Sequence, residues 1–433
     1  MKSFLPLIRQ EWRLLLFGFV LMFATSPGQT YFIALFSGEI RADLSLSHGE
    51  FGMIYSIATL SSAVVLLWTG VLVDRVDLRL FARFATIGLA AACLSLAFSQ
   101  NIVMLFIAIF LLRQLGQGLM YMTSTTAMVR YLESNKGKAN ALSGLGYSFA
   151  EATLPSLVIL LLAVMTWRQS WMLFAAVLAI GIPATFHFLL KGHDERHRQY
   201  LLDIEEEHQD EIDHNANSVA QIPLSSEKKT PSKPRCRQWT REEVIRDPLF
   251  YLFTPGLLAQ SLLFTGFMFH QIHLVEEKGW PLVVWGSLFL LYAIGTVVMN
   301  LVIGVLVDRF GAVRLAPFVT VPMGIGLLML SSSDSVFIAA IFMLCMATSA
   351  AAQSTTSAPF FAERYGSKNL GAIKSLGTFM VVLMSAISPA ILGWGIDRGI
   401  RMDTLAIAGA MYVALTSSMA FYAYRLSLRD SYN

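Results

Sequence analysis

Two ionisable residues, Arg113 and Glu151, lie deep inside long apolar segments of this 433-residue chain. Counted from Asn101 and Ala139, where the segments begin, each lies about 18 Å deep at 1.5 Å per helical residue. Because the hydrocarbon core of a bilayer is about 30 Å thick, we expect both side chains near its midplane. An ionisable group there costs at least roughly 2.5–3.5 kcal/mol and usually serves a function.

These two residue types suggest an anion-binding site with a proton-controlled switch. The guanidinium of Arg113 offers a fork of donors that matches a carboxylate. A substrate carboxylate could compete with Glu151 for Arg113, and protonation of Glu151 would free Arg113 to bind the anion. The alternative is a permanent structural ion pair between the two side chains.

Further polar and aromatic residues share helical faces with this pair. Spacing of i, i+3 and i+4 places on one face Arg113, Gln117, Met120, Tyr121 and Ser124. Tyr147 and Glu151 share a face in the next segment by the same rule. We therefore expect Gln117, Tyr121 and Tyr147 to line a cavity around the two charges, although ordinary helix packing is the alternative for each aromatic or Met.

The first apolar segment carries Pro27, Gly28, Gln29 and Tyr31 in close succession. Pro and Gly inside a spanning helix favour a bend or break that exposes backbone groups to a substrate. Gln271 occupies a comparable place in the seventh apolar segment. The two halves of the chain are sequence repeats, and we expect Gln29 and Gln271 to face each other across the repeat axis that relates them. Gln29, Tyr31 and Gln271 are thus candidates for substrate binding or coupling.

His270 and His273 lie toward the outer end of the seventh segment. Because histidine titrates near physiological pH, we consider His270 a candidate for proton sensing or coupling. The alternative is a pair of interfacial imidazoles whose hydrogen bonds are already satisfied.

The elements that hold these residues are apolar helices. The chain is 55% hydrophobic and 14% charged, whereas a soluble domain carries nearer a quarter charged residues. Its apolar runs are long enough for helices that span a bilayer and too long for strands. We predict an all-α membrane protein with twelve transmembrane helices, at about 14–37, 51–73, 80–98, 102–127, 139–164, 170–190, 249–274, 282–306, 313–331, 334–357, 370–392 and 403–424.

Lys and Arg predict the orientation, because short loops rich in these residues stay on the cytoplasmic side. With both termini inside, the inner tails and short loops hold fifteen of them. The outer side holds five, namely Arg41, Arg168, Lys278, Arg398 and Arg401. We expect a multi-pass plasma-membrane protein with both termini cytoplasmic. The outer loops carry no Asn-x-Ser/Thr sequon, which fits a bacterial inner membrane.

The hexapeptide Gly-Val-Leu-Val-Asp-Arg occurs twice, as Gly70–Arg75 and Gly304–Arg309, 234 residues apart. The same offset relates Gly52 to Gly286 and Pro155 to Pro389. Two copies of one unit in an apolar chain are typical of a transporter built from parallel repeats.

The repeats divide the chain into three parts. We expect an N-terminal six-helix bundle over 1–191, a cytoplasmic linker over 192–247 and a C-terminal six-helix bundle over 248–433. The linker begins acidic and ends basic, which is typical of a partly disordered tether. Thr240 and Glu243 have the spacing of a capping box and predict a short surface helix.

The duplicated hexapeptide resembles the loop motif of the major facilitator superfamily, roughly G-x-L-x-D-R-x-G-R/K-R/K. The first copy supplies Gly70, Asp74, Arg75 and Arg79, and the second supplies Gly304, Asp308 and Arg309. Asp77 stands where the motif has its second Gly. The resemblance implies two pseudo-symmetric six-helix bundles around a cavity. It also implies that these residues gate the cavity, with Asp and Arg latching one conformation. A topological charge anchor is the alternative.

Residues at the end of the eleventh segment resemble those of one branch of this superfamily. Pro389, Gly393, Asp397 and Gly399 are similar to the monocarboxylate and oxalate/formate porter branch. This resemblance implies a small organic anion as substrate, moved with protons or by exchange. The fifth segment lacks the Gly-Pro pair that is usual in multidrug proton antiporters.

Other signatures are absent from the sequence. It has no P-loop, no Cys/His spacing that suits a metal and no recognisable catalytic signature. We therefore expect no enzyme activity, no cofactor, no metal and no nucleic-acid partner. The expected partners are a small-molecule substrate, the lipid bilayer and, as a coupling ion, the proton.

Our primary hypothesis is a monomeric secondary active transporter that moves a small organic anion by alternating access. A first alternative keeps the fold and exports a larger amphiphile, such as a drug or siderophore. A second alternative is a membrane sensor or scaffold that transports nothing, although a static scaffold does not need a duplicated latch.

Overall fold

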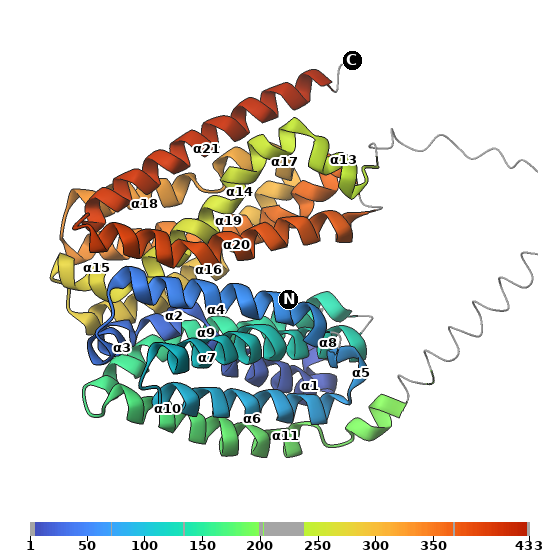
Figure 1. The fold of residues 1–433 in the computed structure, drawn as a ribbon. Helices are drawn as coiled ribbons and strands as arrows, with labels where there is room; N and C mark the ends of the chain where they lie inside the picture. The colour runs from blue at the N-terminus through green and yellow to red at the C-terminus, as the bar shows by residue number, and fades with distance from the viewer. Residues whose placement is uncertain are drawn as a thin grey trace, which may run out of the picture.

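The computed structural model describes residues 5–70, 72–132, 135–198, 202, 238–366 and 369–430. The regular elements within these ranges are all helices, and they form two stacked groups (Figure 1). The described residues between 5 and 198 make the N-terminal group, and those between 238 and 430 make the C-terminal group. We call the end where residues 198 and 238 lie the linker end. The far end carries α3 (Ser37–Leu44) and α15 (Gln271–Lys278).

The elements follow one another without a sheet in either group. The N-terminal group contains α1 (Leu5–Ala24), η1 (Ser26–Gly28), α2 (Thr30–Ala34), α3, α4 (His48–Thr69), α5 (Leu72–Arg75), α6 (Leu78–Ala97), α7 (Ile102–Leu112), η2 (Arg113–Met120), α8 (Tyr121–Tyr131), α9 (Lys136–Leu162), α10 (Trp167–Ala176), η4 (Val177–Gly181) and α11 (Ile182–Leu189). The C-terminal group contains α13 (Arg241–Arg246), α14 (Pro248–Phe269), α15, α16 (Leu282–Phe310), α17 (Ala312–Leu315), η5 (Ala316–Phe318), α18 (Val321–Ser332), α19 (Val336–Tyr365), α20 (Leu370–Asp397) and α21 (Met402–Asp430).

Eleven helices of the described chain are long and apolar enough to cross a membrane, and they match eleven of the predicted spans. The remaining predicted span, 14–37, differs because it is divided into α1, η1 and α2. Counted as one path, these three pieces complete twelve spans in two bundles of six. The predicted all-α membrane fold is therefore confirmed.

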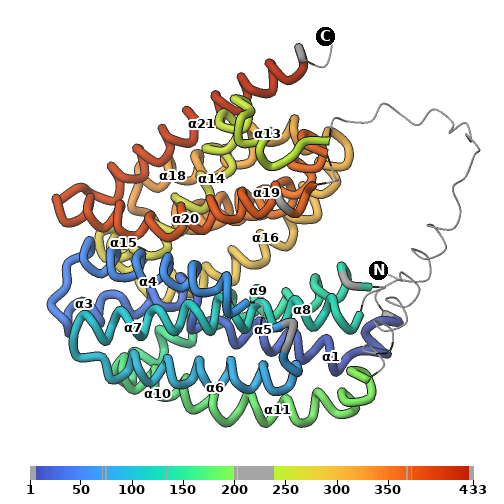
Figure 2. Tube along the Cα trace, turned by 45° about the vertical axis from the view of Figure 1, so that its right-hand side comes forward, coloured from blue at the N-terminus to red at the C-terminus, as the bar shows by residue number. Residues whose placement is uncertain are grey.

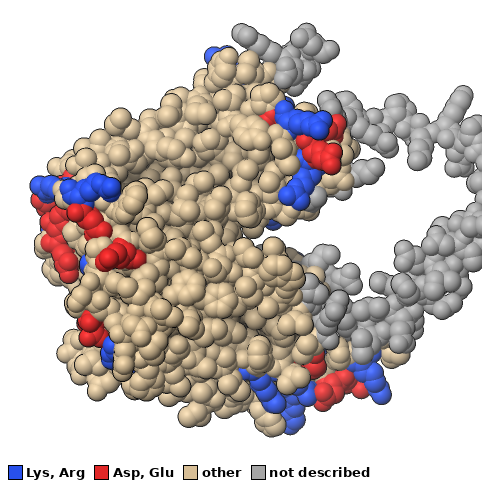
Figure 3. All heavy atoms as spheres, viewed as in Figure 1, with Lys and Arg blue, Asp and Glu red and all other residues tan. Residues whose placement is uncertain are grey.

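On the face shown in Figure 3, charged side chains gather at the two ends of the molecule, and the surface between them is almost free of charge. Large apolar side chains point outward on this belt, such as Leu301, which is 72% exposed, and Ile180, which is 73% exposed. A helix satisfies its own backbone hydrogen bonds, so such a belt is stable in lipid. The molecule is a multi-pass membrane protein.

The two groups touch along two equivalent helix crossings, α4 with α20 and α9 with α16. At the first crossing, a Cβ added to Gly52 would lie 2.5 Å from the Pro389 carbonyl oxygen. At the second, a Cβ added to Gly286 would lie 2.5 Å from the Ile159 Cδ1. Gly52 therefore permits close backbone approach, whereas Gly286 makes room for the Ile159 side chain, and the two glycines are the residues that the repeat offset pairs.

The far end is closed by contacts between the groups. Asp397, at the end of α20, accepts hydrogen bonds from the Ser47 hydroxyl at 2.8 Å and from the backbone N–H groups of His48 at 2.9 Å and Gly49 at 2.8 Å. The carboxylate thus caps the N-terminus of α4 from the opposite group, where the helix dipole favours negative charge. Toward the linker end the two groups diverge in both views (Figures 1 and 2).

The predicted surface helix is present as α13. Thr240 accepts a hydrogen bond from the N–H of Glu243, and the Glu243 carboxylate accepts one from the N–H of Thr240, which is the predicted capping box. The preceding residue, Trp239, donates its N–H to the Tyr365 carbonyl at 3.0 Å and so fixes α13 to α19. Most of the predicted linker, including its charged runs, lies outside the described residues.

Candidate functional site

The first span is broken between α1 and α2. Pro27 lies at the start of η1, and its ring has no N–H for a helical hydrogen bond. Gln29 then adopts an extended backbone, with φ −91° and ψ 147°, before α2 resumes. Of the bend or break expected from Pro27 and Gly28, the structure has a complete break, which leaves backbone carbonyls without helical partners.

Two glycines let this break touch the fourth span. A Cβ at Gly28 would overlap the Leu112 carbonyl and the backbone of Gly116. A Cβ at Gly116 would lie 2.8 Å from the Gly28 Cα. This close approach brings the side chain of Arg113, the first residue of η2, to the backbone of the break.

Arg113 is the cation at this junction, and 3% of it is exposed. Its Nη1 donates to the Gly28 carbonyl at 3.0 Å and, less closely, to the Thr30 hydroxyl at 3.4 Å. The guanidinium carbon lies 5.3 Å from the ring centre of Tyr55, in a cation–π contact. Its Nε is buried without a hydrogen-bond partner. Among the described residues, no carboxylate pairs with Arg113.

The predicted pair of Arg113 with Glu151 is not formed in this conformation. Arg113 turns instead to the break, where it donates to the Gly28 carbonyl. Glu151 is 7% exposed, and it interacts electrostatically with the hydroxyl groups of Tyr31, Tyr147 and Tyr292. Its carboxylate makes no hydrogen bond or ion pair within the part of the chain that the structure describes. The two charges therefore do not pair, although both interact electrostatically with Tyr147.

The segment Arg113–Met120 is a π-helix, and this changes which residues face the cavity. Its wider turn aligns side chains four to five positions apart. Gln117 and Tyr121 consequently stay on the face of Arg113. Met120 is instead fully buried, and Ser124 donates its hydroxyl to the Gly18 carbonyl at 2.9 Å. Neither lines the cavity in the described chain; Met120 follows the alternative of ordinary helix packing, and Ser124 contacts α1.

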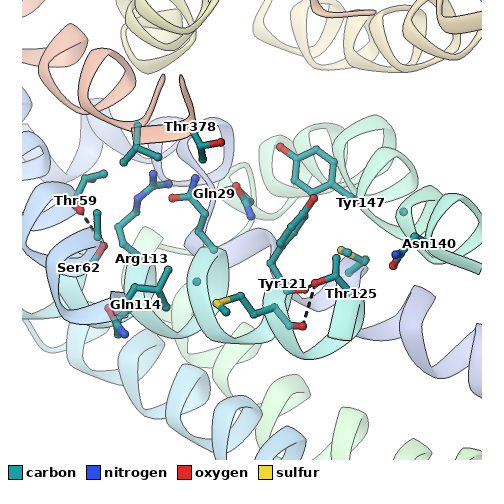
Figure 4. Close-up of a pocket in the computed structure, with 18 residues that line it drawn as sticks. Gln29, Thr59, Ser62, Arg113, Gln114, Tyr121, Thr125, Asn140, Tyr147 and Thr378 are labelled. Carbon is teal, nitrogen blue, oxygen red and sulfur yellow. Dashed lines mark hydrogen bonds between the residues drawn. The ribbon is translucent and has the colours of Figure 1, made fainter. Parts of the chain in front are cut away.

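A cavity of about 780 Å³ lies between the bundles (Figure 4). The predicted residues that line it are Gln29, Arg113, Gln117, Tyr121 and Tyr147. Arg113 and Gln29 lie side by side in it, with Thr378 of α20 on the opposite wall.

A second cavity of about 480 Å³ shares Tyr121 and Thr378 with the first and contains Lys374. No Asp or Glu lines either cavity in the described chain. The joint space therefore carries the positive charges of Arg113 and Lys374 without a negative one.

Tyr31 and Gln271 lie outside the cavity, at its far-end boundary. The Tyr31 hydroxyl donates to Ser26 Oγ at 3.0 Å across the break. Gln271 is fully buried, and its Nε2 donates to the Tyr31 carbonyl at 3.0 Å. Of the two glutamines expected to face each other across the repeat axis, only Gln29 lines the cavity. They are connected through the backbone of Tyr31.

His270 also lies at the far end rather than in the cavity. Its Nε2–H donates to the Pro389 carbonyl at 2.9 Å, and its ring lies 5.7 Å from that of His48, which is 4.5 Å from His273. Burial lowers the pKa of His270 to about 4, so it is neutral at physiological pH. Neither these histidines nor any other described residues form a group that could hold a metal ion.

Several residues that line the cavity or contact Arg113 were not predicted from the sequence. Asn140 lies seven positions before Tyr147 on the same helical face, so extending that face toward the linker end would have found it. Gln114 faces the cavity because of the π-helix, for which the sequence gives no signal. Tyr55 contacts Arg113 from α4, and nothing in its own segment distinguishes it from a core tyrosine.

The first gating motif lies at the linker end of the N-terminal group. Gly70 ends α4. Arg79 pairs with Asp194 at 2.8 Å and donates to the Leu190 carbonyl at 2.9 Å. Asp77, which departs from the motif, accepts the N–H of Arg79 at 2.9 Å and so caps α6. The side chains of Asp74 and Arg75 lie outside the described part of the structure.

The second gating motif makes few contacts in this conformation. The Arg309 guanidinium lies 5.4 Å from the ring centre of Phe310. A Cβ at Gly304 would meet only Thr355, at 4.0 Å. Within the described chain, neither Asp308 nor Arg309 forms an ion pair. The predicted latch is therefore unengaged on this side.

Solved structures of other transporters have a similar architecture. The nucleoside transporter NupG has a similar structure, with a TM-score of 0.67 and 12% identity over 96% of this chain and 98% of that chain. A bacterial homolog to the human lysosomal transporter Spinster, inward-facing and unoccupied, has a TM-score of 0.62 and 12% identity over 96% of this chain and 97% of that chain. Identities this low show the fold alone.

Sequence comparison adds the family. A search of curated proteins finds no significant match. The family comparison, however, matches residues 15–389 to the Major Facilitator Superfamily, which is most of the chain. The chain therefore belongs to the Major Facilitator Superfamily.

Proposed function

We propose that this protein is a secondary active transporter for a small organic anion of carboxylate type. The observation that supports this most is Arg113, a buried guanidinium that lines the cavity without a carboxylate partner in the described chain. An unpaired charge in a low-dielectric site is costly, and an anion bound beside it would offset that cost. A carboxylate also fits the guanidinium fork with two parallel hydrogen bonds.

The remainder of the cavity suits the same ligand. Gln29 lies beside Arg113, and Gln117 lines the same cavity, so their amide groups would orient a bound carboxylate. Lys374, which lines the second cavity, adds positive charge between Arg113 and the linker end. A cleft lined by one sign of charge raises the local concentration of the opposite ion.

Glu151 is our candidate for proton coupling. Its carboxyl group is buried among tyrosines, and no cation in the described chain balances it, so its ionised form is costly in this conformation. A change in the packing of α9 against α16 would alter its surroundings and release or bind a proton. Exchange of one anion for another, with Glu151 in a structural role, is the alternative coupling.

The arrangement of the two bundles supports alternating access, and the charges at its ends support an orientation in the membrane. The far end is closed by Asp397 and the two helix crossings, and the cavity lies toward the linker end. We assign the linker end to the cytoplasm, in keeping with the excess of Lys and Arg predicted for that side. The bundles 1–191 and 248–433 would rock about the cavity, and Asp308 and Arg309 would engage when the linker end closes.

Export of a larger amphiphile is the second candidate, because the cavity walls are partly apolar. Met22, Leu66 and Met122 line the first cavity, and Phe250 and Phe361 line the second cavity. A joint space of this size would hold an apolar body with one anionic group. Such a ligand would still use Arg113, but its affinity would depend mostly on the apolar walls.

The first test is ligand-induced thermal stabilisation of the purified protein. A panel of mono- and dicarboxylates, siderophores and cationic drugs is compared for the parent, Arg113→Gln and the control Arg398→Gln, whose side chain is exposed at the far end. We expect carboxylates to raise the melting temperature of the parent and the control, but not of Arg113→Gln. Stabilisation only by bulky amphiphiles, with no more than a small reduction in Arg113→Gln, would favour the second candidate.

A further inference from the structure

A buried amide joins the two bundles at the broken first span. Gln271 belongs to the C-terminal bundle, and its Nε2 donates to the Tyr31 carbonyl of the N-terminal bundle at 3.0 Å. The side chain has no exposed surface. A hydrogen bond in such surroundings is costly to lose, because the donor and the acceptor would both remain buried without partners.

The Tyr31 carbonyl is available because the helix after the break is irregular. In a regular α-helix this oxygen would accept the N–H of Leu35. That N–H instead donates to the Phe32 carbonyl at 3.2 Å, in a tighter turn. The break thus leaves an acceptor that the opposite bundle fills through Gln271.

Trp285 fixes the orientation of the Gln271 amide. Its indole Nε1–H donates to the Gln271 Oε1 at 2.9 Å, so the Nε2 end of the amide must point toward Tyr31. The indole is itself held in place, with Trp280 stacked on it at 5.8 Å between ring centres. Only 1% of Trp285 is exposed. The amide therefore has one available orientation.

The same break is held from the cavity side by Arg113. The guanidinium binds the Gly28 carbonyl, three residues before the Tyr31 carbonyl that Gln271 binds. The Tyr31 hydroxyl reaches back to Ser26 and closes the short loop between these points. A movement of the Gly28 carbonyl therefore acts on the contact between the bundles through a rigid stretch of few residues.

We propose that Gln271, oriented by Trp285, is the positioning residue through which the C-terminal bundle holds this break and keeps the far end closed. An anion that draws Arg113 away from Gly28 would loosen the break, weaken the bond to Gln271 and favour opening of the far end. The effect of the anion rests on the proposed function. The hydrogen bond from Gln271 to the Tyr31 carbonyl, which we call the tie, does not.

Gln260 provides a matched control for the tie. It is also a buried glutamine of the C-terminal bundle, 7% exposed, but its Oε1 has no hydrogen-bond partner. Gln260→Met and Gln271→Met make the same chemical change inside the same bundle. Only the second removes a hydrogen bond to the N-terminal bundle. Trp285→Phe removes the indole N–H and keeps an aromatic ring, so it tests the orientation of the amide separately.

The experiment measures the far-end separation by electron spin resonance between two labels in the full chain. Ala42 on α3 and Val283 on α16 are exposed positions in opposite bundles and carry the labels, with Cys93, Cys236 and Cys345 replaced by alanine. Without ligand, we expect the ratio of open to closed far ends to rise about tenfold in Gln271→Met and several-fold in Trp285→Phe. A tenfold ratio corresponds to about 1.4 kcal/mol. Gln260→Met should match the parent.

The second arm adds a carboxylate that stabilises the parent thermally. We expect it to shift the parent and Gln260→Met toward the open far end and to leave Gln271→Met almost unchanged. Ligand-free distances in Gln271→Met equal to those of Gln260→Met would overturn the tie. A full response of Gln271→Met to the anion would overturn its coupling to Arg113. If no carboxylate binds the parent, the proposed function fails, and the ligand-free comparison still decides the tie.

Discussion

Gly52 on α4 and Pro389 on α20 meet backbone to backbone, so a Cβ on Gly52 would lie 2.5 Å from the Pro389 carbonyl oxygen. The repeat-related crossing is less rigid. A Cβ on Gly286 would meet the Ile159 Cδ1, the end of a flexible side chain, at the same distance. The two crossings are equivalent by sequence, but they differ in how easily they can yield.

This difference predicts unequal effects of two identical substitutions. Gly52→Ala should weaken far-end closure strongly, because the backbone of α20 must move. Gly286→Ala should have a small effect, because Ile159 can change rotamer. The control is Gly137→Ala, since no atom lies within 4 Å of a Cβ there. Spin-label distances between positions 42 and 283 measure the opening, and equal distances in the Gly52 and Gly286 variants would contradict the prediction.

Asp397→Ala should open the far end without unfolding either bundle. The substitution removes three hydrogen bonds to the start of α4, and loss of such a cap costs about 1 kcal/mol. Asp403→Ala is the control, because Asp403 pairs with Lys278 at 2.6 Å within one bundle. Spin-label distances should lengthen in the first variant and stay unchanged in the second. The reverse pattern would show that Asp397 serves the C-terminal bundle alone.

His270 predicts a loss of stability in acid. Burial lowers its pKa to about 4, whereas the unfolded chain binds the proton near pH 6.5. Between these values the unfolded state binds more protons, so stability present above pH 6.5 falls as the pH drops toward 4. The full loss in the free energy of unfolding is about 3 kcal/mol. Below pH 4 the contribution of this residue changes no further.

Thermal unfolding at pH 7.5 and pH 4.5 measures this effect. His270→Gln keeps a donor for the Pro389 carbonyl but does not titrate, so its melting temperature should fall less than that of the parent. His48 and His273, whose rings lie near each other, also titrate and remain in both proteins. An equal fall in the two proteins would assign the acid sensitivity to those neighbours.

Glu151→Gln should preserve binding of the anion and abolish the pH dependence of its transport. The amide fits the same buried space among the tyrosines and carries no proton that could be released. Uptake into proteoliposomes with an imposed pH gradient, compared with uptake without one, measures the coupling. Gradient-driven uptake that is unchanged in the variant would return Glu151 to a structural role.

Much of the fold follows from regular patterns in the sequence. Long apolar runs predict the spans, and the 234-residue offset predicts that Gly52 and Gly286 occupy equivalent places. Pro27 and Gly28 predict the irregular first span, because both residues weaken a helix there. These features are local, or they repeat along the chain, so no tertiary structure is needed to find them.

The candidate site depended on features that the sequence does not reveal. A π-helix from Arg113 to Met120 moved Met120 and Ser124 off the expected face. Arg113 and Glu151 lie at similar depth, but depth does not determine which way a side chain turns around its helix. The partner of Arg113 is a backbone carbonyl in the break, and every residue type has such a carbonyl.

The central claim, that Arg113 binds the transported anion, is tested most directly by uptake into proteoliposomes. A radiolabelled carboxylate that stabilises the purified protein is supplied to the parent, Arg113→Gln, Arg113→Lys and Arg398→Gln. We predict uptake by the parent and Arg398→Gln, at least a tenfold loss of uptake per unit concentration in Arg113→Gln, and partial recovery in Arg113→Lys, which restores the charge without the fork. Uptake by Arg113→Gln equal to that of the parent would contradict the claim.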